Sequence, residues 1–213
     1  MRHNMSEAHR DFDDANQALG RGVMEQFLWY AGLVWVVDQI PGNCVETLPR
    51  ILNHKIEIQR WSIISQKPFD SVLATIERAI GRPNMAEFIG RMTAATTFDE
   101  MKRIVGESVG EIGLMEFMRL DQGAVLAKAG VGGNPRSVRI ILGNPLIMQS
   151  MARLVPDAGS YAPVTVLIDQ RPDGVHLSYD ETVSVLAPYG NSDALKIAQD
   201  LDSKVKGLLQ TTV

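Results

Sequence analysis

Cysteine is nearly absent from this chain of 213 residues, which contains only Cys44. One cysteine excludes an intramolecular disulfide and offers no cluster for a structural zinc site. The four histidines, at positions 3, 9, 54 and 176, are scattered along the sequence. We therefore expect neither a metal site nor a cofactor.

Long apolar runs and excess positive charge are also missing. No stretch approaches the roughly 20 apolar residues of a membrane-spanning helix, and the N-terminal segment lacks the apolar core of a secretory signal. The formal net charge is -4, and basic residues alternate with acidic ones, which gives no basic patch for nucleic acid. We expect a cytoplasmic protein with no membrane span and no nucleic-acid partner.

The composition is that of an ordinary globular protein, with 45% hydrophobic and 22% charged residues. Residues 1–20 are polar and acidic and predict a tail, whereas the segment VMEQFLWYAGLVWVV at 23–37 is apolar nearly all round. That segment predicts a buried helix or a helix at a subunit interface; an element that faces a membrane surface or a ligand is the alternative. We predict an N-terminal extension over 1–54 and an α/β domain over 55–213.

Hydrophobic periodicity predicts alternating strands and helices in that domain. The predicted strands lie within residues 55–64, 113–121, 136–143, 164–169 and 175–180. The predicted helices lie near residues 69–80, 85–92, 98–105, 145–154 and 192–208, with short helical turns after 121 and 180. The loop AGVGGNP precedes a strand rather than a helix, so it does not predict a phosphate site.

The last two predicted strands form a hairpin. Matching their apolar faces pairs Val166 with Leu177 and Leu167 with His176, around a loop closed by Gly174. This register places His176 on the less apolar face, diagonal to Asp169.

Residues 106–110 match the G-x-S-x-G pattern of serine hydrolases, and Asp169 and His176 follow in the matching chain order. That pattern needs a serine on a turn from a strand into a helix. Ser108 instead follows a helix for which Thr97 and Glu100 predict a capping box, and it precedes a strand. We therefore interpret the pattern as a helix-to-strand connection in which Gly106 and Gly110 terminate the helix, and not as a nucleophile.

Five residues are candidates for a functional site. His176 could act as a general acid or base beside Asp169, although a histidine on a partly solvated sheet face is the simpler interpretation. Asn144 could offer its amide to a ligand or cap the next helix. Met148 and Tyr179 are further candidates for ligand contact, since methionines, ten in this chain, can line a pliable pocket.

Several segments together resemble the bacterial domain-of-unknown-function family 302 over about residues 55–210. The similar segments are KPFDSVL, ILGNPLIMQSMARL, APVTVLID, VHLSYD and the closing ALKIAQDLDSKVKGLL. The resemblance implies an α+β fold with a two-layer arrangement, in which helices pack on one face of an antiparallel sheet, similar to the TATA-box-binding-protein-like class. It also implies that residues 82–110 are inserted helices, and that the protein is a homodimer.

The family implies no activity. From the residues we expect a domain that binds a small, mostly apolar molecule between the sheet and the helices and that associates as a homodimer. The alternative is an enzyme that acts on a small molecule with His176 as general acid or base.

Overall fold

The computed structural model describes residues 55–133 and 135–213. The description below concerns these residues, which belong to the unit 54–213. The predicted tail and apolar helix of residues 1–54 lie outside the described residues.

Within the described residues, five strands form one antiparallel sheet in the order β1-β5-β4-β3-β2. The strands are β1 (Arg60–Ser65), β2 (Met115–Asp121), β3 (Ser137–Gly143), β4 (Val164–Arg171) and β5 (Gly174–Asp180). The helices are α3 (Phe69–Ala79), α4 (Met85–Ala94), α5 (Phe98–Ser108), α6 (Gln122–Lys128), α7 (Pro145–Ala152), α8 (Thr182–Leu186) and α9 (Ser192–Gln210), with 3-10 turns η2 (Pro156–Ser160) and η3 (Ala187–Tyr189).

Local capping explains where several helices begin. Thr97 and Glu100 form the predicted capping box at α5, and Asn191 accepts hydrogen bonds from two backbone N–H groups at the start of α9. Such side chains satisfy donors that a helix leaves unpaired in its first turn.

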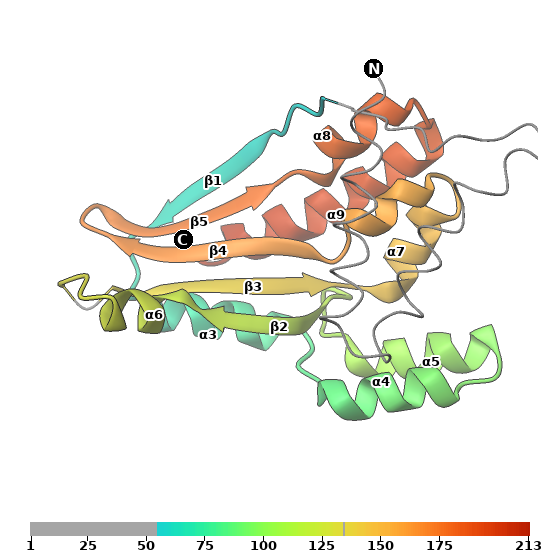
Figure 1. Cartoon of the computed structure of the whole chain (residues 1–213), viewed down its shortest axis with the longest axis horizontal. Helices are drawn as coiled ribbons and strands as arrows, with labels where there is room; N and C mark the ends of the chain where they lie inside the picture. Colours follow the sequence, from blue (N-terminus) through green and yellow to red (C-terminus); the bar gives the residue numbers. More distant parts are fainter. Residues whose placement is uncertain (1–54, 134) are drawn as a thin grey trace, which may run out of the picture. The chain divides into compact units, whose positions relative to one another are not determined.

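Alternation along the strands divides the sheet into a buried face and an open face. The side chains of the buried face pack against α3, α7 and α9 in the main core, and Figure 1 shows α3 and α9 on the same side of the sheet. The core strand residues are Val138, Ile140, Leu142, Val164, Val166, Ile168, Val175, Leu177 and Tyr179. The intervening side chains form the opposite face and are half-buried or exposed, apart from Ser137. We call it the open face.

The arrangement confirms the predicted two-layer α+β class. The predicted hairpin register was wrong by two residues, because Ile168 faces Leu177 and Asp169 faces His176. The connection is also shorter than expected, since Arg171 already pairs with Gly174. A shift of two residues leaves every side chain on its predicted face, whereas a shift of one would have reversed them all.

A β-bulge interrupts β2. The register shifts between Glu116 and Met118, so that Phe117 has no partner on β3. One extra residue brings Glu116 and Arg119, three positions apart, onto the same face of the sheet. Their partners on β3 are the buried Leu142 and Ile140.

Candidate functional site

Two rows of side chains cross the open face. In the first row, Arg139 of β3 faces Leu167 of β4, and Leu167 faces Ser178 of β5. In the second row, Asp169 of β4 faces His176 of β5. The sheet register therefore places the predicted candidates Asp169 and His176 next to the first row.

A hollow of about 470 Å³ lies over the first row, and we call it the sheet hollow. Its apolar lining comes from strands, the turn after η2 and α8, and from the segment before β1. These apolar residues are Ile58, Pro163, Val164, Leu167 and Val185. The volume falls within the range of about 300–1,000 Å³ for small-molecule sites.

Two arginines line the sheet hollow, and their surroundings differ. Arg60 binds Asp180 through two contacts, Nε to Oδ1 at 2.6 Å and Nη2 to Oδ2 at 2.9 Å. This hydrogen bonding lowers the pKa of Asp180 and holds it ionised. Arg139 donates from Nη2 to the Thr165 hydroxyl at 3.3 Å, and it pairs with no carboxylate among the described residues.

Arg139 was not among the site residues predicted from the sequence. The available signal was its position in RSVRIILG, where it is a charged residue within an otherwise apolar strand. Periodicity along β3 places Arg139 and Ile140 on opposite faces of the sheet. Only the positions of the neighbouring elements show that the face with Arg139 contains a hollow.

His176 and Asp169 face each other, yet each has a different partner. His176 Nε2 lies 2.8 Å from Asp173 Oδ1, and Arg171 holds Asp169. The hydrogen bond from His176 lowers the pKa of Asp173. Neither His176 nor Asp169 is among the described residues that line the sheet hollow. The histidine lies in β5 near the hairpin turn, and Asp173 belongs to that turn.

Asn144 and Met148 share a second, smaller cavity of about 110 Å³ with Phe117. Both ends of the Asn144 amide are engaged. Its Oδ1 accepts from Leu146 N at 2.8 Å and caps α7, and its Nδ2 donates to Gly113 O at 2.9 Å. Asn144 thus joins the start of α7 to the segment before β2.

Tyr179 lies in the core, 1% exposed, and is separated from the other candidates. Its hydroxyl donates to Asp202 Oδ1 at 2.5 Å. The same carboxylate accepts backbone N–H groups of Thr182 at 2.9 Å and Val183 at 3.0 Å. Burial and the charge of Asp202 raise the pKa of Tyr179. This network ties the end of β5 and the start of α8 to α9.

Ser108 is the last residue of α5 and not a loop residue. Its hydroxyl is buried and donates to Ile104 O at 2.7 Å. The two glycines of the pattern differ, because Gly106 lies inside the helix, whereas Gly110 lies against the backbone of Ala79. We expected both glycines to terminate the helix, and Gly106 does not. The surroundings lack the strand-turn-helix geometry of a nucleophile elbow.

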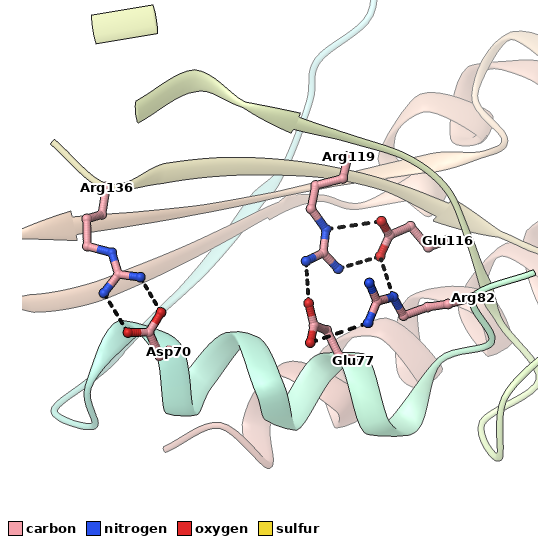
Figure 2. Close-up of polar contacts among 6 residues, drawn as sticks. All are labelled: Asp70, Glu77, Arg82, Glu116, Arg119 and Arg136. Carbon is pink, nitrogen blue, oxygen red and sulfur yellow. Dashed lines mark hydrogen bonds and ion pairs between the residues drawn. The ribbon is translucent and has the colours of Figure 1, made fainter. Parts of the chain in front are cut away.

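Glu116 and Arg119 belong to an ion-pair network between β2 and α3 (Figure 2). Arg119 binds Glu116 through two contacts of 3.0 and 2.6 Å, and also binds Glu77 of α3. Arg82 extends the network with longer contacts to Glu77 and Glu116. These side chains are partly buried between the elements, because the bulge turns both to the helix side of the sheet.

The methionines do not gather in one pocket. Met151 is in the main core, and Met115 packs with Phe88 of α4 in a second cluster. Met118 is 52% exposed. A single pocket lined by methionines is therefore not formed in the described part of the chain.

Over residues 55–133 and 135–213, no group of three or more metal-ligating side chains is placed to hold a metal ion. In the same residues, no helix has both the length and the apolar character needed to cross a membrane.

The model of the family described as "Domain of unknown function DUF302" matches residues 90–212. The chain belongs to the DUF302 family. The matched range includes residues 90–110, which fall within the segment that we expected to be an insertion. No curated protein matches the sequence significantly.

A solved DUF302 structure agrees with the fold. The chain is similar to the crystal structure of an uncharacterized conserved DUF302 protein from Bacillus stearothermophilus, with a TM-score of 0.50 and 10% sequence identity. The alignment covers 72% of this chain and 98% of that chain. At this identity the similarity concerns the fold alone.

Proposed function

We propose that this DUF302 domain is a binding module that takes a small, mostly apolar molecule in the sheet hollow. The observation that supports the proposal is the hollow itself. It has a suitable volume, and apolar side chains from separate segments converge on it, including Ile58, Leu167 and Val185. Small-molecule sites combine such a lining with a few polar groups that fix orientation.

The sheet hollow is a better candidate than the space between sheet and helices. The side chains there form the closely packed main core, and many of them have no solvent exposure. The smaller cavity beside Asn144 has about a quarter of the volume of the sheet hollow, with about 110 against 470 Å³.

An uncharged fragment library and ligand-observed NMR test this proposal. Ser178 lines the hollow at the centre of β5, so Ser178→Trp fills the site. Ser203→Trp, on the exposed side of α9, is the matched control. We expect fragments that bind the wild-type chain and the control but not Ser178→Trp. If no fragment depends on Ser178, the proposal is wrong.

A homodimer is part of the same proposal. The edge strand β2 exposes Met118 and Leu120 on the open face, and exposed apolar edge strands can pair with another chain. Light scattering after gel filtration should give twice the 23.5 kDa of one chain. Met118→Lys should lower that mass, whereas Ser62→Lys on the opposite edge strand should not; a single-chain mass for the wild type would contradict the dimer.

Catalysis by His176 is less well supported, because the histidine does not line the sheet hollow and its Nε2 contacts Asp173. It stays a prediction, as does the cytoplasmic location.

A further inference from the structure

The charges around the sheet hollow are unequal. Arg60 and Asp180 neutralise each other through two hydrogen bonds, so that pair adds no net charge. Arg139 adds a positive charge that no carboxylate of the described residues balances.

Arg139 also has unused hydrogen-bonding capacity. A guanidinium carries five N–H donors, and the one contact to a described side chain is the 3.3 Å bond to Thr165. Its cross-strand neighbours are Leu120 and Leu167, which offer no acceptor from their side chains. A planar guanidinium in such a position matches a carboxylate, because two parallel N–H groups can bind both oxygens.

We infer that the molecule bound in the sheet hollow is an organic acid, whose carboxylate is held by Arg139 and whose apolar body lies against Leu167 and Val185. This inference rests on the proposed function. One unpaired arginine balances the single charge of a carboxylate. A phosphate carries more negative charge than one arginine neutralises, and the ionised Asp180 lines the same hollow.

Octanoate and 1-octanol test the inference, because they share an apolar chain and differ in the charged group. Calorimetric titration of the full chain should show octanoate binding at least about tenfold more tightly than 1-octanol, the size of effect expected of a charge-assisted hydrogen bond. Arg139→Gln should abolish this difference between the two probes. Arg153→Gln, an exposed arginine of the segment after α7, is the matched control and should keep the difference.

The possible outcomes distinguish the binding of an organic acid from the binding of small molecules in general. If both probes bind equally to the wild type and both are lost in Ser178→Trp, the hollow binds small molecules but the assignment of an acid is wrong. If octanoate keeps its advantage in Arg139→Gln, Arg139 does not hold the carboxylate and the inference is also wrong. If neither these probes nor any uncharged fragment binds, the proposed function itself fails.

Discussion

The two faces of the sheet are made by the same strands, yet their surroundings differ. On the buried face, Leu177 of β5 has no solvent exposure and packs in the main core. On the open face, Leu167 of β4 is half-buried and lines a hollow. Polar side chains occupy the open face beside Leu167, including Ser178 and Arg139. The buried face therefore contributes most of the stability.

The largest expected contrast comes from truncating one leucine on each face. Leu177→Ala removes a fully buried side chain, which costs about 2–5 kcal/mol through lost burial and the cavity left behind. Leu167→Ala should cost about 1 kcal/mol or less, because part of the side chain already contacts water. Urea unfolding of the three proteins measures both values. Equal losses would mean that the open face is covered in solution.

A second contrast concerns two glycines four residues apart. A side chain at Gly110 would clash with the backbone of Ala79 and Ile80, so Gly110→Ala should cost about 1–3 kcal/mol through overpacking. Gly106 lies within α5 with open space around its Cα. Gly106→Ala should therefore stabilise the fold by about 0.5–1 kcal/mol, because alanine favours the helix. Thermal unfolding measures both effects. A melting temperature that changed in the same direction in both variants would contradict this reasoning.

The pH dependence of stability tests the buried face of the sheet, through Tyr179. The pKa of Tyr179 is raised by burial and by Asp202, from an ordinary value of 10.0. Above pH 10 the unfolded tyrosine loses its proton while the folded one keeps it, so the contribution of Tyr179 to stability is constant below pH 10 and falls above it. The slope is at most about 1.4 kcal/mol per pH unit.

Tyr179→Phe removes that ionisable group and should show a shallower loss of stability above pH 10. Chemical unfolding at pH 8, 10 and 11 measures it. The same slope in Tyr179→Phe and the wild type would show that Tyr179 does not control it.

The smallest expected effect is that of Ser108→Ala. The Ser108 hydroxyl is buried and donates a hydrogen bond to the carbonyl four residues earlier. The substitution should therefore lower the free energy of unfolding by about 1 kcal/mol or less. Ser150 makes the same type of bond within α7, to Leu146 O at 2.8 Å, and Ser150→Ala is the matched control. A fluorophosphonate probe should label neither serine. Labelling of Ser108 that disappears in His176→Ala would instead indicate a nucleophile.

The order of strands and helices follows from the sequence, because periodicity and caps are local signals. Thr97 and Glu100 predict the start of α5, and the alternation in β4 and β5 predicts which side chains share a face. The register between those strands was wrong by two residues, since apolar faces match equally well after such a shift. The length of the loop between β4 and β5 sets the observed register, in which Asp169 faces His176.

Contacts between elements distant in sequence could not be predicted in this way. The bulge at Phe117 places Glu116 and Arg119 on one face, toward Glu77 of α3. The partner of Tyr179 is Asp202, 23 residues further along the chain on α9.

The sequence by itself determined the elements of the fold and the polarity of each strand face, because these depend on neighbouring residues. The tertiary structure alone decided where the hollow lies and that Arg139 lacks a carboxylate partner among the described residues. Both depend on how elements that are distant in the sequence pack together, and the local pattern of residues along the chain does not specify those contacts.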